Sequence, residues 1–144
     1  MLFRSAAPNA VPNAAQSSAP NTAPTFCIIA VQLLPGTARL VHVRAAAGGS
    51  DAATIESITE ASAEDLWSEP RWSHDGNRIA VTHWQRGGIS EIAILDRKGA
   101  VVRALGRSRA VNGSPAWGPG DSTIFFTSDR NGRSAVYQIG RAHV

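Results

Sequence analysis

From residue 26 onward, short runs of β-branched and aromatic residues alternate with turns rich in Gly, Pro, Asn and Asp, a pattern typical of strands and hairpins. The sequence predicts hairpin turns at Pro35-Gly36, 85–88 and 129–132. One stretch, 60–67, predicts a helical turn, with Ser62 as a possible cap followed by Glu64 and Asp65. The predicted fold class is therefore all-β, built of meandering antiparallel strands at 26–34, 37–44, 53–59, 77–84, 90–96, 100–105, 122–127 and 133–138.

The chain repeats itself. Residues 70–82 and 115–127 align without a gap, and several residue types recur 45 positions apart, at Pro70 and Pro115, Trp72 and Trp117, Ile79 and Ile124, and Thr82 and Thr127. A weaker earlier copy places 29–31 against 79–81 and 39–43 against 91–95. A period near 45 that contains four short strands is typical of a β-propeller blade. The sequence predicts blades at about 26–59, 70–105 and 115–138.

Each part of the repeat has a physical role in this interpretation. The tryptophan is expected to enter the core between neighbouring sheets, and Asp75-Gly76 or Gly120-Asp121 to make the turn into the next strand. The segments Ile79-Ala80-Val81 and Ile124-Phe125-Phe126 are expected to be strands buried on both faces.

The motif Pro-x-Trp-Ser-x-Asp-Gly-x-x-Ile-Ala at 70–80, together with Thr-Ser-Asp-Arg-x-Gly at 127–132, resembles the TolB-type propeller repeat. The resemblance covers 70–138 well and 26–59 weakly. The chain departs from the usual Trp-Ser-Pro-Asp-Gly at His74 and at 118–121. The resemblance implies a periplasmic or secreted bacterial propeller with WD-repeat-like blades, whose relatives bind partner proteins. The N-terminal propellers of prolyl-oligopeptidase-type peptidases share this repeat.

A closed propeller needs about four or more blades, and 26–138 supplies two and a part. The predicted architecture is a partial propeller of two to three four-stranded blades with an open ring. Terminal blades of an open ring expose apolar faces and sheet edges, so we expect poor solubility when the chain is produced alone.

The chain ends look foreign to this domain. Residues 1–5 and 139–144 back-translate to strings that resemble a common sequencing adapter and its reverse complement, which predicts that 6–138 is an internal fragment of a longer protein. Residues 6–25, rich in Pro, Ala and Asn, predict a disordered linker, with a proline-rich recognition peptide as the alternative.

Composition narrows the function further. The net charge of +3 comes from 14 scattered basic residues against 11 acidic ones, and without Arg4 and Arg141 it falls to +1, which argues against a nucleic-acid partner. No apolar run approaches the length of about 20 residues that a membrane-spanning helix needs. The single cysteine, Cys27, permits neither an internal disulfide nor a structural zinc site.

Four groups of residues merit a chemical test. Ser73-His74-Asp75 contains the residue types of a nucleophilic triad, but consecutive residues cannot form the relay, so a turn is expected. His83-Trp84 could line a pocket, although exposed strand-end residues are the expectation. Residues 129–132 suggest a calcium loop but lack a later acidic ligand, which favours a hairpin. The tryptophans at 67, 72, 84 and 117 suggest a stacking platform, but repeat-equivalent Trp72 and Trp117 are expected in the core.

The sequence contains no Gly-x-Ser-x-Gly elbow, phosphate loop or dinucleotide fingerprint, so no catalytic, metal or cofactor-binding residue is predicted. The leading hypothesis is a non-catalytic, TolB-like propeller that binds a protein or peptide at the bacterial envelope. The alternative is the N-terminal gating propeller of a prolyl-oligopeptidase-type serine peptidase whose catalytic domain lies outside this sequence. A third hypothesis is a sensor that carries a propeller after a membrane segment.

Overall fold

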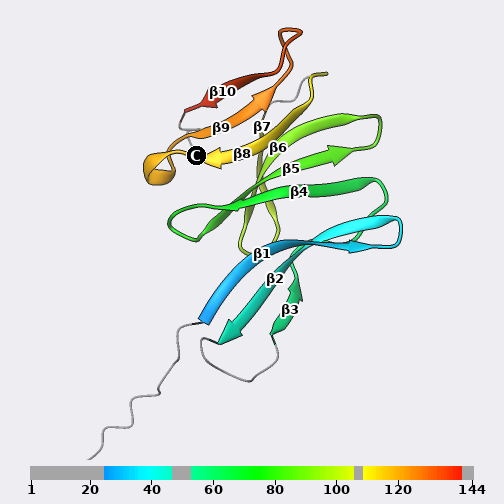
Figure 1. Ribbon diagram of the computed structural model, residues 1–144, viewed down its shortest axis with the longest axis vertical. Coiled ribbons are helices and arrows are strands. Elements are labelled where there is room, and N and C mark those ends of the chain that lie inside the picture. The colour runs from blue at the N-terminus through cyan, green and yellow to red at the C-terminus, as the bar shows by residue number, and fades with distance from the viewer. Residues whose placement is uncertain (1–24, 47–52, 106–108, 141–144) are drawn as a thin grey trace, which may run out of the picture.

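The computed structural model describes residues 25–46, 53–105 and 109–140. Within these ranges the strands form three antiparallel sheets, which follow one another along the chain (Figure 1). The first contains β1 (Thr25–Leu34), β2 (Thr37–Ala46) and β3 (Thr54–Ser57). The second contains β4 (Asp65–Trp72), β5 (Arg78–Gln85), β6 (Ile89–Asp96) and β7 (Val101–Leu105). The third contains β8 (Asn112–Trp117), β9 (Ile124–Ser128) and β10 (Ala135–Ile139). Each sheet is a meander, so the predicted all-β class is confirmed.

Tight turns connect the strands where the sequence predicts hairpins. Pro35-Gly36 joins β1 to β2, and Leu34 pairs directly with Thr37. Gly36 has φ of +73°, a conformation that glycine adopts without steric cost. The turn between β5 and β6 spans 86–88, and that between β9 and β10 spans 129–134.

The second sheet is buried on both faces. Successive side chains of a strand point to opposite sides, so each of its strands contributes to two buried clusters. In β5, Ile79 and Val81 belong to one buried cluster, and Ala80 between them belongs to another. The prediction for this segment is therefore confirmed. The same alternation divides four residues of β6 between the clusters, Ala93 and Leu95 on one side and Ile92 and Ile94 on the other.

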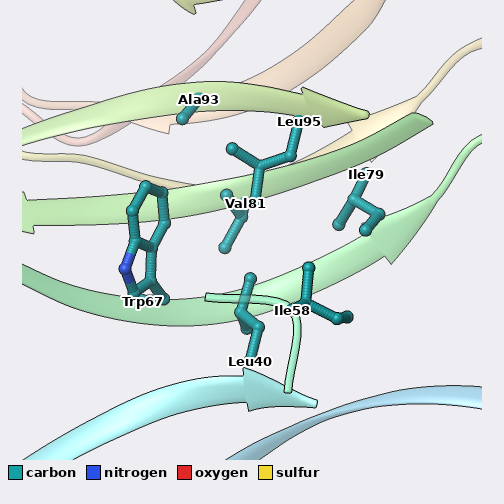
Figure 2. Close-up of a cluster of buried hydrophobic side chains, with 7 residues drawn as sticks. All are labelled: Leu40, Ile58, Trp67, Ile79, Val81, Ala93 and Leu95. Carbon is teal, nitrogen blue, oxygen red and sulfur yellow. The ribbon is translucent and has the colours of Figure 1, made fainter. Parts of the chain in front are cut away.

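Each cluster fills the space between two neighbouring sheets. The first lies between the first and second sheets, where Figure 2 shows Leu40 and Ile58 facing Val81 and Ile79. It consists of Leu40, Ile58, Trp67, Ile79, Val81, Ala93 and Leu95. The second lies between the second and third sheets and consists of Ala80, Ile92, Ile94, Leu105, Ile124 and Phe126. Apolar burial between sheets therefore holds adjacent blades together.

Trp72 and Trp117 occupy equivalent places at the two interfaces, as the repeat predicts. Each ends the first strand of its sheet and is partly buried, Trp72 against the first cluster and Trp117 against the second. The guanidinium of Arg97 lies 6.0 Å from the Trp72 ring centroid, and that of Arg78 lies 4.9 Å from that of Trp117. The two rings differ in one bond. Trp117 Nε1–H donates to the Arg71 carbonyl (3.0 Å), whereas the buried Trp72 Nε1 has no partner among the described residues.

That difference follows from the make-up of the first sheet. β1 and β2 contact β4 as β5 and β6 contact β8, so β1 is the counterpart of β5, and β2 of β6. Within the described ranges the first sheet has no counterpart of β4, the strand that supplies the acceptor for Trp117. The sheets do not close into a ring, and the predicted partial propeller is confirmed.

The two strands that open the second and third sheets, β4 and β8, were not among the predicted elements, and the predicted helical turn at 60–67 is wrong. Ser62 Oγ accepts the N–H of Glu64 (3.0 Å) in a local turn, and Ser62 bridges to Ala38. From Asp65 the chain pairs with β5, which buries Trp67 in the first cluster. Local hydroxyl bonding of this kind competes with a helix start, and sheet pairing prevails here.

The turn that follows each repeated tryptophan closes in the same way despite its different sequence. Ser73 N–H donates to the Arg78 carbonyl, and Gly118 N–H donates to the Thr123 carbonyl, both at 2.9 Å. A Cβ atom at Gly118 would overlap the Thr123 hydroxyl, so a larger residue there would require the Thr123 side chain to move.

Candidate interaction surface

The Ser73-His74-Asp75 segment forms the turn from β4 to β5. Ser73 Oγ donates to Asp75 Oδ1 (2.6 Å) and accepts from the N–H of Arg78 (2.9 Å), so this hydroxyl is occupied inside the turn. The His74 ring instead contacts Asp121, with Nδ1 2.7 Å from Oδ1. A catalytic relay needs the imidazole between hydroxyl and carboxylate. These side chains therefore form a turn and not a triad.

Asp121 links the third sheet to that turn. Its carboxylate accepts the backbone N–H groups of His74 and Asp75, both at 2.9 Å, and its side chain is 7% exposed. Burial alone would raise the pKa of Asp121, but the hydrogen bonds from His74 and Asp75 outweigh it and hold the pKa below its usual value. The two departures from the usual repeat, His74 and Gly120-Asp121, therefore contact each other across the blade interface.

His83 lies among carboxylates and not at an exposed strand end. It is 8% exposed, its Nε2 lies 2.9 Å from Asp65 Oδ1, and its Nδ1 lies 3.3 Å from Glu91 Oε1. The Trp67 ring stacks on the imidazole with 4.0 Å between centroids. The predicted exposure of His83 is wrong because these neighbours cover it, and Trp84 is half-buried. The network ties β4 to β5 and β6.

Residues 129–132 form the predicted hairpin turn. Gly132 N–H donates to the Asp129 carbonyl (2.8 Å), and Asp129 Oδ1 accepts the N–H of Val111 (2.7 Å). The carboxylate thus connects this turn to the start of β8. Across the described ranges, no group of three or more His, Cys, Asp or Glu side chains is arranged to hold a metal ion.

The four tryptophans do not form one stacking platform. Trp67 and Trp72 pack against the first cluster, Trp117 packs against the second, and Trp84 lies at the far end of β5. A single strand of nucleic acid needs successive exposed rings on one surface. The core role expected for Trp72 and Trp117 accounts for their positions.

The strands β4 and β8 share an irregularity at the same repeat position. Pairing is interrupted at 69–70 in β4 and at 114–115 in β8. Glu69 and Ser114, 45 positions apart, have φ of +54° and +52°. This conformation costs a non-glycine residue about 1–3 kcal/mol, and such outliers concentrate at functional sites. Bulges also redirect side chains, and they are common beside binding sites.

The bulges bring exposed side chains of β4 and β8 onto one surface. Both strands pair on one side only, and they contact each other across the two sheets. We call their exposed residues the inner surface, because the strands of neighbouring blades that converge lie nearest the propeller axis. The inner surface consists of Leu66, Glu69, Arg71 and Ser114.

Glu69 fixes the geometry of the inner surface. Its Oε2 accepts the N–H of Ser114 and the hydroxyl of Thr82, both at 2.7 Å, and its Oε1 accepts the Ser114 hydroxyl (3.0 Å). Burial acts to raise the pKa of Glu69, but these bonds and nearby Arg71 lower it below the usual value. One carboxylate thus joins two strained positions of adjacent blades.

Sequence reasoning missed Glu69 and Ser114. Each directly precedes a proline of the repeat, Pro70 or Pro115, and the aligned segments began at those prolines. Extending the alignment by one residue would have included both. Their different residue types, however, give no sign of a common backbone conformation.

Comparison with known protein families agrees with this geometry. A family model described as the TolB beta propeller domain matches residues 37–143. The match begins at the first residue of β2 and extends beyond β10, so it includes strands of all three sheets. In the described part of the chain, no helix has the length and apolar character needed to cross a membrane.

Proposed function

The chain belongs to the TolB beta propeller domain family, and from this premise we propose that it is a non-catalytic propeller segment that binds a protein or peptide at the bacterial envelope. Fold membership does not by itself define a function. The observation that carries the proposal is the repeated bulge, which places exposed, strained residues on two adjacent first strands.

The inner surface has the chemistry of a peptide-binding strip. β4 and β8 each keep one backbone edge outside the sheet pairing, and such edges bind extended peptides through main-chain hydrogen bonds. Leu66 offers apolar contact, Arg71 offers a cation, and Ser114 offers a hydroxyl. Because Glu69 already holds both bulges in place, a ligand would not have to order them on binding.

Peptide selection against the immobilised chain tests the proposal. Peptides from a displayed library are selected on the wild-type chain and then measured against two variants that introduce the same bulky cation. Leu66→Arg lies on the inner surface, where Leu66 is 42% exposed, and Val102→Arg lies on the exposed side of β7, where Val102 is 58% exposed. The matched charge separates a local effect from a general electrostatic one.

The expected result is that Leu66→Arg weakens binding of the selected peptides about tenfold or more, since blocking a central contact commonly costs above 1 kcal/mol. Val102→Arg should change it less than twofold. Equal effects of the two variants, or selected peptides that bind both as well as wild type, would argue against a binding role for the inner surface. Fractionation of cells that make the full-length protein tests the envelope location.

A further inference from the structure

A cavity separate from the inner surface lies between the first sheet and the β6–β7 turn. Its volume is about 370 Å³, and its lining includes His42 and Arg44 of β2, Glu56 of β3, and Arg97 and Lys98 of the turn. This volume is within the range of small-molecule sites, which are about 300–1,000 Å³. One side of the cavity therefore belongs to the first blade and the other side to the second.

Direct contact between the blades sets the position of the turn. Gly99, next to Lys98, has φ of +90°, and a Cβ atom there would overlap the Ile58 carbonyl oxygen. Only glycine permits this approach. The backbone that carries Arg97 and Lys98 is thus held against the first sheet.

The cavity carries excess positive charge. Three cationic side chains, Arg44, Arg97 and Lys98, face one carboxylate, Glu56. Glu56 pairs with Arg44 at 3.6 Å, and in the described ranges Arg97 and Lys98 form no ion pair. The formal balance of these side chains is therefore positive by two charges.

His42 adds a buried polar atom without a partner. The residue is 4% exposed, its ring stacks on Trp72 with 5.2 Å between centroids, and its Nε2 has no hydrogen-bond partner among the described residues. Burial lowers the pKa of His42, and Arg44 and Arg97 lower it further against the opposing effect of Glu56, which favours the neutral ring. A neutral imidazole carries one N–H. An unpaired buried polar atom is costly, and a ligand that bonds to it would recover that cost.

We propose that this cavity binds a small phosphate-bearing ligand, with Arg97, Lys98 and Arg44 as cationic contacts and His42 Nε2–H as a neutral donor. A phosphomonoester carries about −1.5 to −2 charges at pH 7 and three acceptor oxygens, which match the excess charge and the several donors. A planar carboxylate would neutralise only half of that excess. The cavity also has room for an organic group beside the phosphate.

Titration of the full chain with inorganic phosphate and with phenyl phosphate tests the proposal. The readout is the ¹⁵N shifts of the histidine rings, with His42→Gln used to assign the resonance, and with chloride at matched ionic strength as the reference. Phosphate should shift the His42 Nε2 resonance to the value of a hydrogen-bonded N–H, and phenyl phosphate should bind at least as tightly. No shift, or the same shift with chloride, would overturn the proposal.

Charge variants separate a built site from general attraction. Arg97→Gln and Lys98→Gln should each weaken phosphate binding about tenfold, because each removes a charge-assisted hydrogen bond to the phosphate. Arg103→Gln removes the same charge from exposed β7 and should change binding less than twofold. Equal weakening by Arg97→Gln and Arg103→Gln would refute a specific site. Amide spectra of each variant show whether the fold is retained.

Discussion

At the residue scale, adjacent blades are joined by carboxylates that accept backbone N–H groups. Glu69 of β4 accepts Ser114 N–H, and Asp121 of the third sheet accepts two N–H groups of the preceding blade's turn. Such bonds need little side-chain ordering on the donor side. The exposed pair of Arg86 and Glu64, by contrast, is open to solvent on both sides and should contribute little to stability.

The link made by Asp121 predicts a pH dependence. Because the folded-state pKa lies below the usual value of 3.8, the stabilisation is fully present above that value and is lost as pH falls through the folded pKa. Asp121→Asn should lower the free energy of unfolding by about 1–3 kcal/mol at pH 7 and by much less at acid pH. Urea unfolding followed by tryptophan fluorescence measures both. Glu64→Gln is the control and should have almost no effect at either pH.

If Asp121→Asn were as destabilising at low pH as at pH 7, the carboxylate charge would not be the source of the link.

Gly99 and Gly87 form a matched pair for a second test. Their φ values are +90° and +92°, but only at Gly99 would a Cβ atom meet another residue, the carbonyl of Ile58. Gly87→Ala should cost about 1–2 kcal/mol for the left-handed conformation alone. Gly99→Ala should cost clearly more, because the turn must also move away from the first sheet. Similar costs in urea unfolding would mean that the turn does not pack against Ile58.

At the element scale, the first strand of the second sheet and that of the third sheet each contact the preceding blade. β8 contacts β4, β5 and β6, and its last residue, Trp117, bonds to the backbone of β4. β4 contacts β1 and β2 in the same way. Within the described ranges, however, the first sheet has no strand equivalent to β4, and Trp72 Nε1 has no backbone acceptor. The two tryptophans therefore differ in hydrogen bonding while sharing their packing.

This difference predicts unequal costs for the same substitution. Trp117→Phe and Trp72→Phe remove similar apolar area, but only the first removes a hydrogen bond, leaving the Arg71 carbonyl without it. Trp117→Phe should reduce the free energy of unfolding by about 1 kcal/mol more than Trp72→Phe. Denaturant unfolding of the two variants gives the comparison. A larger cost for Trp72→Phe would contradict the assignment of the indole contacts.

Strands such as β5 and β6 were predictable from the sequence, because each is a run of apolar residues next to a glycine-containing turn. β8 was not, since Gly113, Ser114 and Pro115 interrupt any apolar period and its pairing depends on β9. Ser62, Glu64 and Asp65 match the pattern of a helix start. The segment from Asp65 forms a strand instead because pairing with β5 buries Trp67. The cavity residues His42 and Arg97 meet across a blade interface, which no local motif indicates.

At the scale of the whole molecule, burial is uneven. The second sheet is covered on both faces, whereas the first and third sheets each share one buried cluster with it. Large apolar side chains remain exposed on the terminal sheets, including Leu33 at 80%, Val136 at 71% and Ile28 and Ile55 at 60%. Repeats at the ends of an array need a neighbour or a polar cap to remain soluble. Ile28, Ile55 and Val136 lie on the faces turned away from the two clusters, where further blades that close the ring would cover them.

The central claim is that the chain forms an open propeller whose first and third sheets each have one uncovered apolar face. Sedimentation velocity of the chain over a wide range of concentrations tests this claim most directly. The account predicts self-association that increases with concentration, and a reduction when Ile28→Lys and Val136→Lys are combined. A monomer at every concentration, unfolding in one cooperative transition, would contradict it.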